Sequence, residues 1–494
     1  MIALALFLLQ WIFMPIIFIL FLHSYTQKCN KLPLWNFPLL GVLPHFLINF
    51  HRLHDKLTEG LERSHGSLLI KHSWFAQNDL FLTSDPANVH HILSTNFHNY
   101  PKGPEWREKF DIFGDDGIFN SDFEAWKLHR KVARALFSHQ KFQQLATKTM
   151  QEITQKGLIP VLEHVSEKNK EFDLKHLLNR GTFDFACAIT TGYNPNFLSM
   201  EQPEVPFLKA IDDACEAIFF RYERKLSNGW RSLDCFWEEC LSYKREKMSE
   251  VVATTSKNED EESFIDLLEC YLSGNEVTGA TPNEKVMRDN VIALILAAED
   301  TTGITLSWFF WLLSKNNPLI EAKIREEITE NLPFQPMKFS REDLSKLVYL
   351  HAALCETLRL FPPIPFQLRK NEETDTLPSG HEIKMNTDVL ISMYAIGRMR
   401  SVWGEDCYEF KPERWISEDG KIKHVPPQKF FAFNAGPRIC PGREIGFNLM
   451  KIIAATVIQN YEVQILENQG VIPSNLSISF YIKDGLMARI KKRS

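Results

Sequence analysis

One short segment near the C-terminus constrains this chain most, and it reads Phe433-Asn434-Ala435-Gly436-Pro437-Arg438-Ile439-Cys440-Pro441-Gly442. It presents a single cysteine, Cys440, between glycines and beside Arg438. A thiolate can ligate iron, and nearby donors lower its pKa and hold it ionised. Gly436 and Gly442 allow backbone N–H groups to approach the sulfur closely. We therefore interpret Cys440 as the thiolate ligand of a haem iron. The alternative is a buried cysteine in a glycine-rich turn.

The other cysteines form no pattern. The chain has 9 cysteines, with no Cys-x-x-Cys pair and no Cys-x-x-Cys-His motif. This distribution favours a single-sulfur site over a disulfide framework or a zinc cluster. An odd, unpatterned set of cysteines is typical of a reducing compartment.

The pattern Phe-x-x-Gly-x-Arg-x-Cys-x-Gly resembles, at every fixed position, the signature of the cytochrome P-450 family of haem-thiolate monooxygenases. The resemblance implies haem b as cofactor and one large, mainly α domain with small β-sheets over residues 46–494. Length alone would also allow several domains, since roughly 460 residues exceed the usual domain size. The net charge of −6, without a basic arm, indicates no nucleic-acid partner.

Residues 1–22 are apolar apart from Gln10. A helix of this length spans about 33 Å, enough to cross a hydrocarbon core of about 30 Å. We expect a transmembrane signal anchor. The alternative, a cleaved signal peptide, lacks a positive n-region and a small-x-small cleavage site. Positive charge after the span, at His23, Lys28 and Lys31, places the body in the cytosol, on the endoplasmic reticulum membrane. Residues 23–45 form a proline-containing linker.

Hydrophobic periodicity predicts helices and a few short strands after the linker. The expected helices cover 122–138, 141–164, 264–271, 284–314, 319–331 and 341–360. The expected strands cover 68–72, 80–83, 389–394 and a closing pair around the Asp484-Gly485 turn. Two stretches, 254–262 and 273–282, are expected to be solvated loops.

The helix around residue 300 is apolar on all sides, but Glu299 to Thr302 interrupt it, which argues against a second membrane span. The segment 297–302 is similar to the oxygen-activating motif of the family, apart from Ala298 in place of a glycine. The resemblance implies that Thr301 holds dioxygen and Asp300 relays protons, with a narrower groove at Ala298. The alternative is a buried polar pair bonded to the preceding turn.

Two further motifs match the family. Glu356 and Arg359 lie three apart on one helix, and Arg414 follows in Phe410-Lys411-Pro412-Glu413-Arg414-Trp415. By resemblance these three form a buried structural network under the haem loop, whereas alone Glu356 and Arg359 would be a surface pair. Trp126 and Arg130 match Trp-x-x-x-Arg, and the resemblance makes them, with Arg438 and Arg369, partners of the haem propionates.

The chain has no Gly-x-Gly-x-x-Gly unit after a strand and no flavin motif, so electrons must come from a partner. The resemblance implies an NADPH-cytochrome reductase. A basic face for this reductase could be formed by Lys127, Lys131, Arg134 and Arg443. The alternative is that these residues belong to an ordinary solvated helix face.

Several stretches resemble plant enzymes of the clan that oxidises fatty acids and alkanes, in particular its alkane-hydroxylase and alkaloid-coupling branch. They are 99–104, 117–122 and 308–315. The candidate substrate pocket is apolar and comprises Phe110, Phe113, Ile118, Phe119, Ala297, Pro365, Phe366, Val471 and Ile472. We expect hydroxylation of a long aliphatic substrate from the membrane, with oxidative phenol coupling as an alternative. The other classes considered are a haem-thiolate isomerase or dehydratase and a non-catalytic haem sensor.

Overall fold

The computed structural model describes residues 14, 42–70, 78–115, 117–201, 206–210, 223–254, 266–273, 282–316, 318–332, 339–466, 471–475 and 477–493. Apart from Met14, the predicted anchor and the linker up to residue 41 lie outside these ranges. The end of the predicted linker begins helix α2 (Leu43–Ile48), because Pro44 lies in the first turn, where a missing N–H breaks no helical hydrogen bond. The chain divides into two compact units, Met1–Tyr100 with Phe366–Cys407, and Pro101–Pro365 with Tyr408–Ser494.

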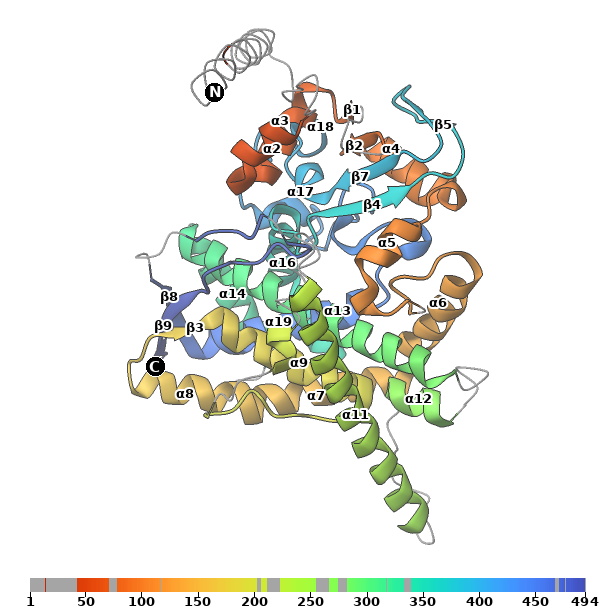
Figure 1. The fold of residues 1–494 in the computed structure, drawn as a ribbon. Coiled ribbons are helices and arrows are strands. Elements are labelled where there is room, and N and C mark those ends of the chain that lie inside the picture. The colour runs from red at the N-terminus through yellow and green to blue at the C-terminus, as the bar shows by residue number, and fades with distance from the viewer. Residues whose placement is uncertain are drawn as a thin grey trace, which may run out of the picture. The chain divides into compact units, whose positions relative to one another are not determined.

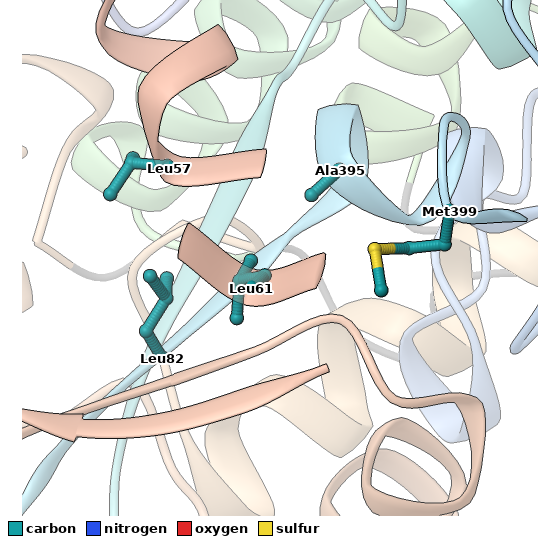
Figure 2. Close-up of a cluster of buried hydrophobic side chains, with 5 residues drawn as sticks. All are labelled: Leu57, Leu61, Leu82, Ala395 and Met399. Carbon is teal, nitrogen blue, oxygen red and sulfur yellow. The ribbon is translucent and has the colours of Figure 1, made fainter. Parts of the chain in front are cut away.

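The first unit is built on a four-stranded sheet in the order β1-β2-β7-β4 (Figure 1). Strand β1 (Ser67–Ile70) pairs antiparallel with β2 (Leu80–Thr83), β2 pairs parallel with β7 (Asp388–Ser392), and β7 pairs antiparallel with β4 (Phe366–Lys370). Figure 2 shows the buried cluster that packs α3 (Leu53–Arg63) near β2: Leu57, Leu61, Leu82, Ala395 and Met399. The remaining elements are α4 (Pro86–His90), β5 (Asp375–Thr376), β6 (Glu382–Ile383), α17 (Met393–Ile396) and α18 (Arg400–Trp403).

The second unit is mainly helical. Its helices are α5 (Pro104–Lys109), α6 (Phe123–Ser138), α7 (Gln140–Ile153), α8 (Ile159–Glu167), α9 (Leu174–Thr191), α11 (Glu223–Thr254), α12 (Leu267–Ser273), α13 (Glu284–Lys315), α14 (Pro318–Asn331), α15 (Arg341–Lys346), α16 (Val348–Leu360) and α19 (Arg443–Asn460). A three-stranded sheet has the order β3-β9-β8, from Phe172–Asp173, Met487–Lys492 and Tyr461–Ile465.

Helix α13 runs through the core of this unit. Asn283 caps its start, where the side chain accepts the N–H of Val286 at 2.8 Å. Helix α9 packs against it, and Gly303 permits the close approach, since a Cβ there would lie 2.3 Å from Asn179 Oδ1. Within the described part of the chain, α13 is the one helix long and apolar enough to cross a membrane, and 72% of its apolar window is buried in the protein.

The predicted helices 122–138, 284–314 and 319–331 correspond to α6, α13 and α14, and 264–271 overlaps α12. Two others are divided. A π-helical turn, Thr154–Leu158, separates α7 from α8, where Pro160 supplies no N–H to a regular ladder. The helix predicted over 341–360 breaks at Leu347, and α16 restarts with the Glu327 carboxylate accepting the N–H groups of Tyr349 and Leu350.

Two strand predictions were partly wrong. Strand β7 ends at Ser392, whose hydroxyl accepts the N–H of Ala395 and caps α17, so Met393 and Tyr394 are helical. The closing pair around Asp484-Gly485 is not a hairpin, because β9 pairs with β8 and β3. Gly485 still makes a turn, with φ +79°. The predicted loops at 254–262 and 273–282 fall almost entirely outside the described residues.

Candidate functional site

The loop that carries Cys440 is held by its own backbone. The N–H of Cys440 donates to the carbonyl of Phe433 at 2.8 Å. Gly436 has φ +63°, a conformation that suits glycine. A Cβ at Gly442 would lie 4.0 Å from the Cys440 sulfur, so the backbone passes close to the thiol. The loop therefore presents one thiol at a fixed position.

Opposing effects act on that thiol. Cys440 is an exposed residue. The protein around its sulfur nevertheless excludes enough water to disfavour the charged thiolate, which raises the pKa of the thiol. The backbone N–H of Gly442 and the guanidinium groups of Arg130 and Arg443 lower the pKa. These donors are the groups that would stabilise a thiolate ligand.

Two buried arginines and a tryptophan lie beside the loop. Arg130, on α6, donates through Nη2 to the carbonyl of Ile439, next to Cys440. Its Nε is buried without a hydrogen-bond partner among the described residues. The guanidinium of Arg438 lies 4.5 Å from the centroid of the Trp126 ring and donates to Asp122 at 2.5 Å. The structure thus brings Trp126, Arg130 and Arg438 together with Cys440.

The charge of this cluster fits a haem. Burial lowers the pKa of Arg438 to about 10, with Asp122 acting against the shift and Arg130 adding to it. Burial also lowers the pKa of Arg130, as does Arg134, while Cys440 raises it. The two buried guanidinium groups of Arg130 and Arg438 have one carboxylate beside them, that of Asp122. This charge balance favours the binding of a further anion, and haem carries two propionates. The exposed thiol and the unpartnered Nε are therefore consistent with haem as the bound group.

Asp300 and Thr301 on α13 make different hydrogen bonds. The Thr301 hydroxyl donates to the carbonyl of Ala297 at 2.7 Å. This is the bond to the preceding helical turn that is expected if Asp300 and Thr301 are only a buried polar pair. The Asp300 carboxylate instead accepts from the hydroxyl of Ser479. Both Thr301 and Ala297 are half-buried. A hydroxyl that donates to a carbonyl keeps lone pairs with which it can accept a hydrogen bond.

The predicted buried network is assembled around Glu356. Arg359 donates to both carboxylate oxygens at 2.7 Å, and Arg414 Nε lies 3.3 Å from one of them. The indole of Trp415 and the N–H of Lys411 donate to the same carboxylate at 2.8 and 3.0 Å. The side chains of Glu356 and Arg359 are 0% exposed. One carboxylate therefore joins α16 to residues 411–415.

Aromatic side chains connect this network to the cysteine loop. The ring of Trp415 lies 4.5 Å from that of Phe430, which lies 6.2 Å from that of Phe433. Phe433 accepts the N–H of Cys440 through its carbonyl. Aromatic contacts thus connect the Glu356 network to the residue that binds the Cys440 N–H.

The loop before α6 gathers the predicted aromatic pocket residues. The ring centroids of Phe110 and Phe113 are 6.1 Å apart, and those of Phe113 and Phe119 are 5.7 Å apart. Phe110 is buried, whereas Phe113, Ile118 and Phe119 are half-buried. The side chain of Asn290 on α13 accepts the N–H of Ile118 at 2.9 Å. This bond fixes the loop to the same helix that carries Thr301.

The remaining predicted site residues have the following local surroundings. Arg369 is buried in β4 of the first unit, where its guanidinium donates to Leu368 O and Gln367 Oε1. The Phe366 ring stacks at 6.1 Å on His54 in that unit. Pro365 is buried at the end of a segment of the second unit. Val471 and Ile472 line a small hollow with residues of β8 and β9, and Ile472 is 52% exposed.

The comparison with protein families decides the assignment, because the model for cytochrome P-450 matches residues 32–486. The chain belongs to the cytochrome P-450 family. This P-450 monooxygenase is 39% identical over 496 residues to the alkane hydroxylase MAH1 of Arabidopsis thaliana, covering 96% of this chain and 97% of the relative. It is 36% identical over 504 residues to noroxomaritidine synthase 2 of Narcissus aff. pseudonarcissus MK-2014, covering 97% and 95%.

The fold agrees with a solved P-450 structure. The crystal structure of the cytochrome P-450DA haem domain superposes with a TM-score of 0.76 at 21% identity, covering 93% of this chain and 97% of that chain. The predicted mainly α P-450 fold with small sheets is confirmed.

Sequence reasoning missed three residues of this P-450 site. Asp122 lies at the N-cap position of α6, so local pattern favours a capping role, yet its carboxylate binds Arg438 and the N–H groups of Lys102 and Gly103. Ser479 and Asn290 carry no local signal, because their partners are far away in the chain.

Proposed function

We propose that this P-450 inserts one oxygen atom from dioxygen into an unactivated C–H bond of a long aliphatic substrate, an alkane or a fatty acid. The observation that carries the proposal is the apolar character of half-buried side chains on and beside α13: Ala297, one turn before Thr301, and Phe113, Ile118 and Phe119 in the loop that Asn290 of the same helix binds. Such a lining favours a hydrocarbon and offers little to a charged group. The 39% identity to an alkane hydroxylase supports the same class of substrate.

Each site residue has a proposed role. When bound, haem b supplies the activation of dioxygen. Cys440 would hold its iron as a thiolate, while Trp126, Arg130, Arg438 and Arg369 would bind its propionates. Thr301 would hold a proton at its hydroxyl oxygen, and the Asp300 carboxyl would resupply it. The network of Glu356, Arg359 and Arg414 would keep the cysteine loop in place.

Electrons would come from an NADPH-cytochrome reductase. On α6, Lys127, Lys131 and Arg134 are exposed, as is Arg443 at the start of α19. A basic face of this kind suits an acidic partner. We further propose that residues 1–22 anchor the enzyme in the endoplasmic reticulum membrane by a single span, with the catalytic domain in the cytosol.

Oxidative coupling of a phenolic alkaloid precursor is the second candidate. The aromatic rings of Phe110, Phe113 and Phe119 follow one another at centroid distances of 6.1 and 5.7 Å, and they would suit a phenolic ring. An isomerase, a dehydratase or a haem sensor is disfavoured, because none of these needs the pair of Asp300 and Thr301.

Spectral titration of the full-length, haem-loaded protein separates the two candidates. We expect hexadecane or hexadecanoic acid to shift the haem spectrum saturably and a phenolic amine to leave it unchanged. Ala297→Leu should weaken aliphatic binding because it adds bulk beside Thr301, whereas Ala125→Leu, at an exposed position on α6, should not. Saturable shifts with phenolic amines and none with aliphatic chains would favour the coupling reaction instead.

A further inference from the structure

The hydroxyl of Ser479 is a partner of Asp300 that belongs to a different part of the chain. Ser479 is 3% exposed and donates to Asp300 Oδ2 across 179 residues of sequence. A hydrogen bond from a buried hydroxyl to a carboxylate is directional and stronger than one between neutral groups. Ser479 therefore constrains the direction in which the Asp300 carboxylate points.

The segment around Ser479 is itself firmly held. The N–H of Phe480 donates to Pro363 O at 2.8 Å, and the indole of Trp308 donates to Phe480 O at 2.7 Å. The Trp308 ring also stacks on Phe361 at 4.2 Å. Because Trp308 and Asp300 both lie on α13, the helix holds this segment at two points. The Ser479 hydroxyl is thus presented to Asp300 by a fixed backbone.

Adjacent residues of an α-helix point about 100° apart, so Asp300 and Thr301 leave α13 in different directions. The Thr301 hydroxyl is bonded to its own helix at Ala297 O, and the Asp300 carboxylate is bonded to the Ser479 segment. The orientation of the Asp300 carboxylate is therefore set in part by a contact outside its own helix.

We propose that Ser479 is a positioning residue for proton delivery, which holds the Asp300 carboxylate in the orientation from which it supplies Thr301. This inference rests on the proposed relay role of Asp300. Ser479 acts through Asp300, and its loss should matter only while Asp300 is present.

The test uses the full-length, haem-loaded protein in lipid nanodiscs. Chemically reduced protein that carries one further electron equivalent of reductant per haem is mixed with dioxygen in a stopped-flow spectrometer, in H₂O and in D₂O, and the rate of return to the oxidised spectrum is recorded. With two electrons and two protons dioxygen leaves as hydrogen peroxide, so this rate depends on proton delivery and needs no substrate. We expect Ser479→Ala to change the rate and its solvent isotope effect, the rate by at least about three-fold, because the proton donor is misplaced.

Three variants make the outcome specific. Ser479→Thr keeps the hydroxyl and should restore the wild-type rate. Ser307→Ala removes a different buried hydroxyl, which lies on α13 and donates to Gly303 O. This variant should leave the rate unchanged. The double variant of Asp300→Asn with Ser479→Ala should match Asp300→Asn alone, since Ser479 acts through Asp300.

The possible failures are distinguishable. If Asp300→Asn changes the rate and Ser479→Ala does not, the positioning role is wrong and the relay role stands. If Asp300→Asn keeps the wild-type rate, the relay role itself fails. Additive effects in the double variant would show that Ser479 acts by another route and would overturn the inference. The carbon monoxide spectrum of each variant checks that the haem site is intact.

Discussion

The carboxylate of Asp122 lies 2.5 Å from the guanidinium of Arg438, two residues before the cysteine that we assign to the iron. The same carboxylate accepts the N–H groups of Lys102 and Gly103 at 3.2 and 3.1 Å. One buried acid thus links the cysteine loop, the start of α6 and the backbone just before α5. Replacing Asp122 should therefore disturb the haem site, although none of these bonds joins Asp122 to Cys440 itself.

We expect Asp122→Asn to release haem at least about ten-fold faster, because the charged acceptor that holds Arg438 beside the cysteine loop and binds the N–H groups of Lys102 and Gly103 is lost. Haem transfer to apomyoglobin measures this rate. Glu124→Gln is the matched control, because Glu124 lies in the same turn but is 85% exposed and pairs with Lys127. Equal haem transfer from the Asp122 variant and the wild type would contradict the prediction.

Cys440→Ala should abolish the strongly red-shifted Soret band of the reduced carbon monoxide complex, because no thiolate would remain to ligate the iron. Absorption spectra of the purified variant test this directly. Cys235→Ala, at the other exposed cysteine among the described residues, should keep the band. A normal band in the Cys440 variant would remove the basis of the haem assignment.

Glu356→Gln should destabilise the protein by about 3–5 kcal/mol, because it leaves the buried guanidinium of Arg359 without its carboxylate. Urea unfolding followed by tryptophan fluorescence measures the loss. The exposed Glu413, which binds Lys323 and Tyr349, provides the control, and Glu413→Gln should cost less than about 1 kcal/mol. Similar costs for the two variants would show that the network is not a structural hub.

Phe123→Asn should stabilise the protein by about 0.5–1 kcal/mol, since asparagine tolerates the left-handed conformation better than a bulky residue. Phe123 has φ +51° and is 47% exposed, so little packing is lost. Thermal unfolding reports the change. Leu128→Asn, at an exposed position within α6, should not stabilise the protein.

Burial raises the pKa of Asp184 to about 6, against the N–H groups of Phe197 and Leu198 and the charge of Arg180. The folded protein therefore binds more protons than the unfolded chain between about pH 4 and pH 6. The contribution of Asp184 to the free energy of unfolding is present below pH 4 and is lost as the pH rises through 6, by up to about 3 kcal/mol.

Asp184→Asn removes this titration. The midpoint of thermal unfolding of the variant, relative to the wild type, should rise between pH 4 and pH 7. A difference that stays constant over this range would contradict the shifted pKa. Asp234→Asn, at a carboxylate that is 56% exposed, serves as the control.

Local patterns predicted the elements whose causes are local. The length of α13 follows from an apolar run that Asn283 caps, and α6 follows from its amphipathic periodicity. Where a partner distant in the chain decides the structure, prediction failed. The break at Leu347 depends on Glu327 of another helix, and β9 pairs with β8, which lies outside the expected hairpin.

The candidate site shows the same limit. Motifs with fixed spacing, such as Cys440 with Arg438 or Glu356 with Arg359, could be read from the sequence and are found together in the structure. Asp122 and Ser479 could not, because a single acid or serine has many possible roles and only the folded chain selects one. The conformation of Phe123 has no sequence signal at all.

The contacts that close the cysteine loop come from distant parts of the chain. Arg130 reaches Ile439 across 309 residues, and Asp122 reaches Arg438 across 316. During synthesis from the N-terminus, both partners on the early side leave the ribosome long before the loop exists. The cysteine loop therefore cannot be closed until residues 438–440 have been synthesised, so haem would be taken up only after α6 and the loop have both left the ribosome.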